Sequence, residues 1–500
     1  MKTLTELGLT AQGGAEAQVT GLAVDSREVK PGFLFAALPG TTVHGGEFIQ
    51  YALRMQAAAI LTDAKGAEIA AEELAASDAA LIVAEDPRQT LAQTASLWFG
   101  PHPAMMVAVT GTNGKTSVST FCRQLWEAMD IAGVNLGTTG VEGVWSPEQN
   151  FVGAEPTTPQ PITLHRVLAE ARANDVTHVA MEASSHGLDQ RRLDGVLLAA
   201  AGFSNFTQDH LDYHGTFEAY FDAKMGLFKR VLPEDGVAVI NLDDPKGSEV
   251  ADICTARGQE VISVGHYADA RLRLTGQRFD ATGQDILFTW LGQPHQARLD
   301  LIGGFQAENA LLAAGMVIGA GAAPADVFAA LPKLSTVRGR MELAATRANG
   351  AAVFVDYSHT PDSVATALKA MRPHVMGRII VIVGAGGDRD PGKRGPMGAA
   401  AAQNADIVIV SDDNPRSEDP ATIRAAVMAG AVNAGGTDSI TEVGDRAEAI
   451  LRGIDQLAPG DALLIAGKGH ETGQIVGDAV LPFDDVEQAS VAVAALEGRI

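Results

Sequence analysis

One stretch of the chain restricts its possible fold more than any other: residues Met105–Thr120 read MMVAVTGTNGKTSVST. The apolar start, Met105–Val109, predicts a buried strand, and the residues after the small-residue turn predict a helix that runs to Trp126. A strand, a glycine turn and a helix start together form a phosphate cradle, because backbone N–H groups and the helix dipole direct positive potential at an anion.

The polar residues of this turn suit a nucleotide that carries magnesium. Lys115 can reach the outer phosphates, and the hydroxyl of Thr116 or Ser117 can bind Mg²⁺. The general P-loop pattern has a glycine where this chain has Val109, so an ordinary strand-to-helix turn with a surface lysine is the alternative. The predicted ATP-binding residues of the loop are Gly111, Thr112, Asn113, Gly114, Lys115, Thr116 and Ser117.

Length and composition limit the number of domains and the class of partner. A chain of 500 residues predicts roughly three domains. The net charge of -24 argues against a nucleic-acid partner, because phosphate binding needs a basic face. The two cysteines, Cys122 and Cys254, cannot form a disulfide scaffold. The sequence shows neither a signal peptide nor a membrane-spanning segment, so we expect a cytoplasmic protein without membrane insertion.

The run VTGTNGKTS, which begins at Val109, resembles the ATP loop of the muramyl (Mur) ligase superfamily, whose members include folylpolyglutamate synthases. The resemblance implies an α/β chain of three domains. They are a small N-terminal α/β domain that binds a UDP-sugar (1–87), a central P-loop ATPase domain with a mostly parallel sheet (88–333), and a C-terminal Rossmann-like α/β domain that binds an amino acid (334–500). Alternating strand and helix patterns after residue 88 independently favour parallel sheets.

Two polar segments, Val24–Arg27 and Leu38–Thr42, interrupt the strand and helix pattern of the first domain. Ordinary turn chemistry would explain both of them. In the family, the matching segments hold the uridine end of a UDP-muramyl peptide, and this chain has His44 where the family usually has Asp. The residues that the resemblance assigns there are Val24, Ser26, Thr41 and Thr42.

Three central residues could serve a metal ion. Glu182 ends a predicted strand near the phosphate loop, where a hard oxygen ligand can face Mg²⁺, although a helix-capping glutamate is the alternative. His210 lies in a His- and Asp-rich run, and the family's histidine there binds a second Mg²⁺. Lys224 matches a lysine that the family carbamylates, which requires a deprotonated amine. The implied catalytic residues are Lys115, Glu182, His210 and Lys224, and the implied metal ligands are Thr116, Glu182, His210 and the Lys224 carbamate.

Two polar turns of the central domain could bind the second substrate. One is Glu155–Pro159, and the other runs from Ser184 to Arg192. The pair Arg191 and Arg192 suits a diphosphate or a carboxylate. The alternative is that both arginines are solvated residues at a helix end. The family places its UDP-muramyl-dipeptide on Thr157, Thr158, Ser184, Gln190 and Arg192.

Two further residues match family contacts to ATP. Asn309 is expected at the adenine, in a segment where Gln306 replaces the usual Asn. Arg340 is expected to meet ATP from the third domain. In that domain, predicted strands end in polar motifs that begin near Asp356, Gly384, Asp412 and Gly467, which is the pattern of a site at the carboxyl edge of a parallel sheet.

The run Asp413–Arg416 carries the most selective information. Taken alone it is a turn with a proline, but in the family it marks enzymes that add meso-diaminopimelate. Arg416 can pair with the distal carboxylate, which lysine lacks, and such a site can reject the analogue by ~10⁴-fold. The residues implied to bind diaminopimelate are Arg389, Asp413, Asn414, Pro415, Arg416, Gly467 and Glu471.

The resemblance thus implies a monomeric ligase that uses ATP and Mg²⁺ to add meso-diaminopimelate to the D-glutamyl residue of UDP-N-acetylmuramoyl-L-Ala-D-Glu through an acyl phosphate. Such a reaction serves peptidoglycan synthesis, and through it cell wall biogenesis, cell shape and cell division. Three alternatives stay open: addition of L-lysine to the same dipeptide, a folylpolyglutamate-synthase-like ligase, and an ATP-driven regulatory module in which the loop is a nucleotide switch.

Overall fold

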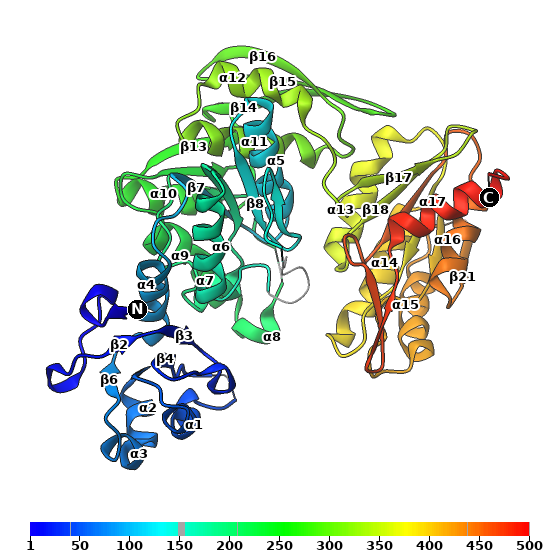
Figure 1. Ribbon diagram of the computed structural model, residues 1–500. Helices are drawn as coiled ribbons and strands as arrows, with labels where there is room; N and C mark the ends of the chain where they lie inside the picture. Colours follow the sequence, from blue (N-terminus) through cyan, green and yellow to red (C-terminus); the bar gives the residue numbers. More distant parts are fainter. Residues whose placement is uncertain (41, 149–155, 208, 438, 500) are drawn as a thin grey trace. The chain divides into compact units, whose positions relative to one another are not determined.

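The computed structural model describes residues 1–40, 42–148, 156–207, 209–437 and 439–499 (Figure 1). The chain forms two compact units. The first unit comprises Met1–Arg273 and Ala310–Ala330, and the second comprises Leu274–Asn309 and Leu331–Ile500. Helix α11 (Phe305–Gly319) therefore begins in the second unit and ends in the first. Within the described residues, no helix combines the length and the apolarity that crossing a membrane requires.

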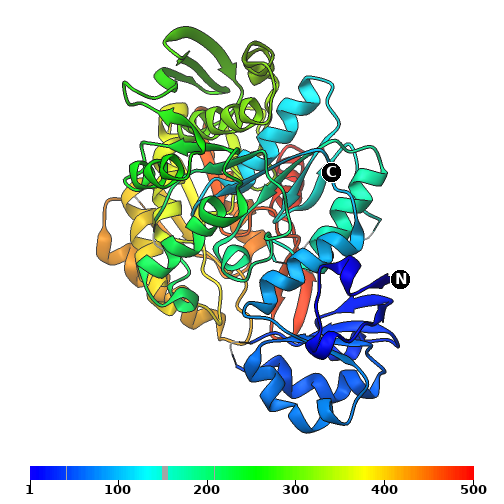
Figure 2. The ribbon, with the colours of Figure 1, turned by 90° about the vertical axis from the view of Figure 1, so that its left-hand side faces the viewer.

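A small parallel sheet of order β3-β4-β5-β6 lies near the start of the first unit. Its strands are β3 (Gly21–Ala23), β4 (Phe33–Ala36), β5 (Ala59–Thr62) and β6 (Ala80–Val83), after a ribbon of β1 (Lys2–Thr3) and β2 (Gln18–Val19). Its short helices are α1 (Ile49–Arg54), α2 (Ala64–Ile69) and α3 (Ala71–Ala75), drawn in blue in Figures 1 and 2. Phe35 shares a core with Ile49 of α1, whereas its neighbour Leu34 points to the opposite face and shares a core with Leu91 of α4 (Pro87–Phe99).

The central sheet of the first unit has the order β13-β12-β11-β7-β10-β8-β9, and its neighbours are parallel except for β8 and β9. Its strands are β7 (Met105–Thr110), β8 (Gly133–Gly137), β9 (Gly140–Gly143), β10 (His178–Glu182), β11 (Ala200–Phe203), β12 (Val237–Asn241) and β13 (Glu260–Gly265). Its helices are α5 (Lys115–Ala128), α6 (Pro161–Ala173), α7 (Ser185–Asp189), α8 (Leu211–His214), α9 (Phe217–Gly226), α10 (Gly247–Ala256) and α12 (Pro324–Ala330). The strand and helix predicted from the phosphate-loop sequence are thus confirmed as β7 and α5. Strand β7 is almost wholly buried, as a parallel strand covered on both faces should be.

The second unit contains a six-stranded sheet of order β17-β18-β22-β19-β20-β21, in which only the pair β17 and β18 is antiparallel. Its strands are β17 (Glu342–Thr346), β18 (Ala352–Asp356), β19 (Ile379–Val383), β20 (Ile407–Val410), β21 (Ser439–Glu442) and β22 (Ala462–Ala466). Its helices are α13 (Pro361–Met371), α14 (Arg394–Asn404), α15 (Pro420–Ala434), α16 (Arg446–Asp455) and α17 (Asp485–Leu496), and a hairpin of β23 (Gly473–Val476) and β24 (Ala479–Pro482) precedes α17. The predicted mostly parallel sheets are confirmed in both units.

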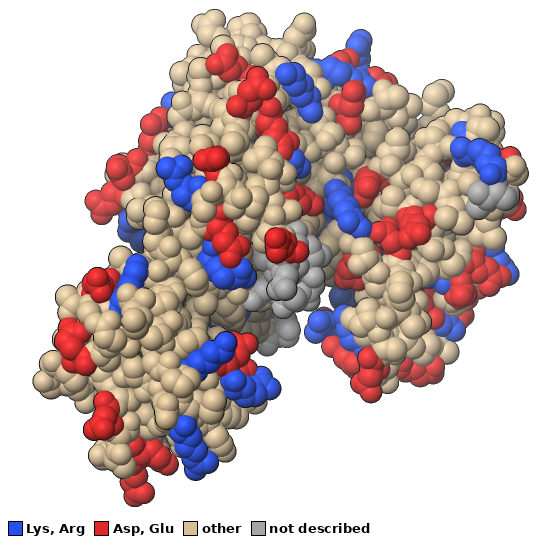
Figure 3. Space-filling view, viewed as in Figure 1, with Lys and Arg blue, Asp and Glu red and all other residues tan. Residues whose placement is uncertain are grey.

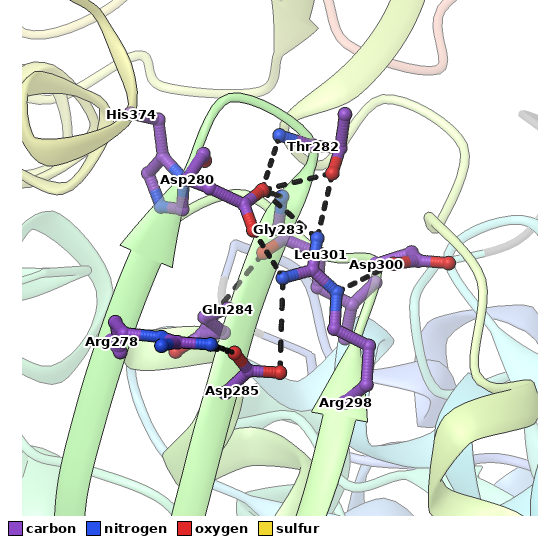
Figure 4. Close-up of polar contacts among 10 residues, drawn as sticks. All are labelled: Arg278, Asp280, Thr282, Gly283, Gln284, Asp285, Arg298, Asp300, Leu301 and His374. Carbon is purple, nitrogen blue, oxygen red and sulfur yellow. Dashed lines mark hydrogen bonds and ion pairs between the residues drawn. The ribbon is translucent and has the colours of Figure 1, made fainter.

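A set of long strands, β14 (Leu272–Asp280), β15 (Gly283–Trp290) and β16 (Gln293–Leu299), leads into the second unit. Figure 4 shows how a histidine of the 3₁₀ segment after α13 ties the tip of these strands to the C-terminal sheet. The Nε2 atom of His374 accepts from the backbone N–H of Gly303 (3.0 Å), so the proton is on Nδ1, which donates to the carbonyl of Asp280 (2.7 Å). Burial holds the pKa of His374 below its usual range, which keeps this neutral tautomer.

The C-terminal sheet is also held by an ion pair whose two side chains are completely shielded from solvent. The guanidinium of Arg446, at the start of α16, donates two hydrogen bonds of 2.7 and 2.8 Å to the carboxylate of Asp485, at the start of α17. It also donates to the carbonyl oxygens of Asp412 (3.3 Å) and Ala466 (3.0 Å), which follow β20 and end β22. The pair therefore connects the starts of α16 and α17 to the ends of β20 and β22.

Replacement of this arginine should destabilise the second unit strongly. Arg446→Met leaves the Asp485 carboxylate buried without its partner, and we expect the free energy of unfolding to fall by about 3–5 kcal/mol. Native-state hydrogen exchange at the amides of β22 measures this sheet separately from the rest of the chain. The matched control is Arg452→Met on the same helix, because Arg452 is exposed and forms an ion pair with Glu448 on the helix surface. Equal exchange in both variants would contradict the prediction.

Candidate active site

The register of three parallel strands brings the phosphate loop beside two other polar segments. Val109 of β7 lies opposite Glu182 of β10, and Thr110 lies opposite Phe203 of β11. Because parallel strands end at the same edge of a sheet, the residues that follow all three strands converge there. The first candidate site is therefore built at the carboxyl edge of the central sheet, as the sequence predicted for this part of the chain.

The phosphate loop is braced by the segment that follows β11. The side-chain carbonyl of Asn205 accepts from the backbone N–H of Asn113 (2.8 Å), and the hydroxyl of Ser204 donates to the carbonyl of Asn113 (2.6 Å). Gly111 has a φ of 151°, and a Cβ there would lie 2.0 Å from the Ser204 hydroxyl, so the approach requires glycine. Sequence reasoning missed both bracing residues, although they stand directly after a predicted strand.

The side chain of Lys115 lies back over this loop at the start of α5. Its Nζ donates to the carbonyl oxygens of Gly111 (3.0 Å) and Thr112 (2.8 Å). The hydroxyl of Thr112 contacts the Tyr220 hydroxyl at 3.2 Å, so α9 also supports the loop. These contacts place the lysine amine at the loop whose backbone would cradle a phosphate, where the predicted role requires it.

Glu182 is buried and fully engaged by donors from two neighbouring segments. One carboxylate oxygen accepts from the Thr116 hydroxyl (2.9 Å), and the other accepts from the backbone N–H of Thr138 (2.8 Å). A Cβ on Gly137 would lie 2.1 Å from that second oxygen, so a larger residue there would displace the carboxylate. The carboxylate and the Thr116 hydroxyl form a pair of hard oxygen ligands that suits Mg²⁺, and both belong to the predicted metal set.

Lys224 is buried beside the same loop and stands in the last turn of helix α9. Its Nζ donates to the carbonyl of Gly111 (2.7 Å) and lies 4.5 Å from the ring centre of Tyr220. Burial, reinforced by the positive charge of Lys115, holds the pKa of the Lys224 amine well below its usual range. A neutral buried amine is the chemical form that carbamylation requires, so the predicted modification fits this environment.

His210 completes the predicted metal set from the turn before α8. Partial burial lowers its pKa to about 4, against the opposing effect of Asp209 and with help from His186, Lys115 and Lys224. Its ring is therefore neutral at pH 7 and can donate a lone pair to a metal ion. Among the described residues no three acidic, histidine or cysteine side chains already form a ready metal cluster, so the full ligand set stays a prediction.

The residues predicted to bind the UDP-muramyl-dipeptide in the central domain lie together beside Glu182. The Thr158 hydroxyl donates to the Glu182 carbonyl (2.9 Å) and accepts from the backbone N–H of Ser184 (2.9 Å). Arg192 donates to the Thr158 carbonyl (2.6 Å) and to the Gln190 side chain (2.8 Å). Thr157 reaches the same cluster through its hydroxyl, which lies 3.2 Å from that of Thr138. The structure thus brings all five predicted residues together.

The first domain contributes a second set of predicted substrate residues. Val24 is exposed, Ser26 begins a 3₁₀ turn that Asp25 caps, and Thr42 is exposed, whereas Thr41 lies outside the described residues. His44, which replaces the family's usual Asp, accepts from the backbone N–H of Gly46 (2.9 Å) through Nδ1. It therefore performs the local capping that an aspartate would provide.

The residues predicted to contact ATP from the second unit are placed by local contacts there. Asn309 is buried in α11, and its amide donates to the side-chain carbonyl of Gln306 (3.2 Å). Gln306, which replaces the family's usual Asn, therefore uses its side-chain amide to contact Asn309. The guanidinium of Arg340 lies over the ring of Tyr357, 4.5 Å from its centre.

A second candidate site lies within the second unit, where loops follow β19, β20 and β22. A Cβ built on Gly386 would lie 2.7 Å from the Arg416 guanidinium and 3.9 Å from Cγ of Arg389, so both arginines approach this glycine. Gly467 has a φ of 116° and lies against the carboxylate of Asp413. The structure thus brings together the residues predicted to bind diaminopimelate, with Asn414 and Pro415 between Asp413 and Arg416.

The amide of Asn414 connects the loop after β20 to the loop after β22. It donates to the Glu471 carboxylate at 2.8 Å. Arg416, whose own φ is 52°, donates from its guanidinium to the carbonyl of Gly387 (2.8 Å). The site therefore has two arginines for carboxylates and a carboxylate with an amide for an amine, which is the complement of an amino acid with charged groups of both signs.

Three family models match the chain in sequence order. The model described as Mur ligase family, catalytic domain, matches residues 18–98. The Mur ligase middle domain matches residues 109–317, and the Mur ligase, glutamate ligase domain, matches residues 339–469.

Similar proteins extend over nearly the whole chain. The UDP-N-acetylmuramoyl-L-alanyl-D-glutamate--2,6-diaminopimelate ligase of Bradyrhizobium diazoefficiens is 47% identical over 485 residues, which are 96% of each chain. The ligase of the same name from Caulobacter vibrioides is 46% identical over 482 residues, again 96% of each chain. A solved structure described as that of UDP-N-acetylmuramoyl-L-alanyl-D-glutamate--2,6-diaminopimelate ligase has a TM-score of 0.69 and 31% identity, and covers 96% of this chain and 95% of the other.

These similarities confirm the resemblance that the phosphate loop suggested, together with the predicted three-domain α/β architecture. The bounds predicted for the three domains, after residues 87 and 333, stay predictions. The role of each individual site residue stays a prediction as well.

The environment of Lys224 predicts a carbamate at this residue. Because burial depresses the pKa of its amine, the unprotonated form that attacks CO₂ is favoured. After equilibration with ¹³C-bicarbonate, ¹³C NMR should show a carbamate resonance in the unaltered protein and none in Lys224→Met. Lys369→Met removes an exposed lysine and should keep the resonance. Persistence of the signal in Lys224→Met would show that another amine carries it.

Proposed function

The chain belongs to the Mur ligase family, and from that premise we propose that it joins meso-2,6-diaminopimelate to the D-glutamyl residue of UDP-N-acetylmuramoyl-L-alanyl-D-glutamate at the expense of ATP. The observation that carries the proposal is identity of nearly half, over 96% of both chains, with ligases named for this reaction. The arrangement around Arg416 supports the same choice of amino acid. The product is a peptidoglycan precursor, which connects the enzyme to cell wall biogenesis, cell shape and cell division.

The proposed reaction has two steps. The terminal phosphoryl group of ATP passes to the free side-chain carboxylate of the D-glutamyl residue, which gives an acyl phosphate and ADP. The amine of diaminopimelate then attacks the acyl carbon, an amide bond forms, and phosphate leaves as the amine loses a proton. Lys115 lies where it can offset the negative charge on the phosphoryl group in transfer, and the loop N–H groups fix its oxygens.

We propose that Mg²⁺ is bound by Thr116, Glu182, His210 and the carbamate of Lys224. The first two already form a hydrogen-bonded pair of oxygen ligands, and the neutral ring of His210 suits a ligand. A bound Mg²⁺ would offset the charge of the nucleotide phosphates. Reaction of the Lys224 amine with CO₂ would give an anionic carbamate, whose oxygen atoms can bind Mg²⁺.

The proposed partners are small molecules: ATP, the UDP-muramyl-dipeptide and diaminopimelate. Figure 3 shows acidic and basic side chains interspersed on the face that it draws, and the net charge of -24 gives no reason to propose a nucleic-acid partner. We propose that the enzyme acts in the cytoplasm as a monomer. Size-exclusion chromatography with light scattering tests the oligomeric state.

The amino-acid requirement of phosphate release tests the proposed function. The protein is incubated with ATP, Mg²⁺ and UDP-muramyl-dipeptide, together with meso-diaminopimelate, L-lysine or no amino acid. Release that requires both the dipeptide and diaminopimelate supports the proposal. Release with lysine at equal efficiency would favour the lysine ligase, and release from ATP alone would favour a nucleotide switch.

Arg416 should control the affinity for diaminopimelate. Arg416→Ala removes the guanidinium that would pair with the distal carboxylate, and we expect KM for diaminopimelate to rise by about 10- to 100-fold, as loss of a charged hydrogen bond implies. KM for ATP and for the dipeptide should stay within about twofold, because their predicted residues lie elsewhere. Arg452→Ala, an exposed arginine of the same unit, is the control. An unchanged KM for diaminopimelate would contradict the assignment of Arg416.

A further inference from the structure

Lys468 is a buried lysine that the reaction described above does not use. It follows β22, between the site residues Gly467 and Glu471, and its side chain is 0% exposed. Its Nζ donates to the side-chain carbonyl of Asn414 (3.1 Å) and to the Glu471 carboxylate (3.2 Å). A lysine is rarely removed from solvent unless its charge is paired, and here both partners belong to the predicted amino-acid site.

The contacts of Asn414 allow only one orientation of its amide. The side-chain oxygen accepts from Lys468 Nζ and from the backbone N–H of Ile475 (2.9 Å). The side-chain nitrogen donates to the same Glu471 oxygen that Lys468 contacts (2.8 Å). Because an amide oxygen cannot donate and an amide nitrogen cannot accept, rotation of the group by 180° would break all three bonds.

The hairpin of β23 and β24 fixes the backbone of the same loop. Gln474 donates from its side chain to the carbonyl of Asp413 (2.7 Å), and the backbone N–H of Arg416 donates to the carbonyl of Ile475 (3.0 Å). The hairpin thus sets the path of the loop, but it supplies no charged group to Glu471 or to the Asn414 side chain. Lys468 is the charged group that contacts both of these side chains.

Glu471 can reach solvent whereas Lys468 cannot, because 32% of the glutamate side chain is exposed and none of the lysine side chain is. Without the lysine, its carboxylate can turn toward water, where it is well solvated. The Asn414 amide would then lose two of its contacts, one to each partner, and would keep only the backbone N–H of Ile475. Removal of Lys468 would therefore release two residues of the amino-acid site while leaving the loop backbone in place.

We propose that Lys468 is a positioning residue for the amino-acid site, which holds the Asn414 amide and the Glu471 carboxylate in the arrangement that receives the incoming amino acid. The proposal rests on the proposed function, because it takes the loops after β20 and β22 as the diaminopimelate site. It concerns binding of the amino acid rather than phosphoryl transfer, for which the predicted phosphate-loop and metal-binding residues belong to the first unit.

The test compares Lys468→Met with Lys369→Met, which removes an exposed lysine of the same unit. We expect KM for diaminopimelate to rise by about 10- to 100-fold in Lys468→Met, as loss of charged hydrogen bonds implies, with KM for ATP and the dipeptide within about twofold of the unaltered enzyme. A uniform loss of kcat with all KM values unchanged would overturn the proposal, because a merely structural lysine would lower the amount of active enzyme.

A double-mutant cycle with Glu471→Gln tests whether Lys468 acts through Glu471. If it does, Lys468→Met should raise KM for diaminopimelate by a much smaller factor in the Glu471→Gln background than in the unaltered enzyme. Equal factors in the two backgrounds would overturn the proposal. Lys468→Gln is made in parallel, because its amide keeps a hydrogen-bond donor at this position and should destabilise the fold less than Lys468→Met.

The outcomes separate failure of this inference from failure of the proposed function. An unaltered enzyme that joins no diaminopimelate to the dipeptide refutes the function, whatever the variants do. An active unaltered enzyme with an unchanged KM in Lys468→Met refutes only the positioning role. Loss of folding in both Lys468 variants, with Lys369→Met folded, would assign Lys468 to the stability of the sheet and would also overturn the proposal.

Discussion

The hydrogen bonding of one buried carboxylate, that of Glu182, determines how the central site is assembled. A carboxylate removed from water is costly unless donors surround it, and Thr116 and Thr138 provide those donors. The donors follow β7 and β8, and the glutamate ends β10, which lies between those two strands in the sheet. The parallel topology therefore brings a phosphate loop and a hard oxygen ligand together by short connections, and Lys224 and His210 then approach from segments that follow β11.

The C-terminal sheet is also mostly parallel, but the buried charged groups beneath its loops include cations, whereas the central site has the carboxylate of Glu182. Arg446 lies under the ends of β20 and β22, where its buried pairing with Asp485 fixes two helix starts. Lys468 lies in the loop that follows β22 and contacts the side chains of Asn414 and Glu471. Buried cations thus support the loops whose residues would receive an amino acid.

The sequence predicted those parts of the molecule in which the informative residues are contiguous. The phosphate loop is one such part, and the polar motifs after apolar strands are others, because parallel strands bring their carboxyl ends together. Ser204 and Asn205 escaped prediction because they brace the loop from about ninety residues away in the sequence. The contact of Lys468 with Asn414 escaped for a similar reason, since the two residues are 54 positions apart in the sequence. The sequence showed that His44 departs from the family pattern. Its hydrogen bond with the backbone N–H of Gly46 could not be predicted, because it depends on the conformation of the backbone.

The contacts of His374 have a consequence for a study of the C-terminal part of the chain alone. A fragment that starts at residue 334, where the sequence suggests a boundary, would retain this histidine but discard Asp280 and Gly303, the two backbone partners of its ring. Both ring nitrogens would then face solvent, together with the apolar surface beside Phe279. Dissection of the chain at a single point therefore cuts through a folded unit, and an autonomous half has to be assembled from two separate stretches of sequence.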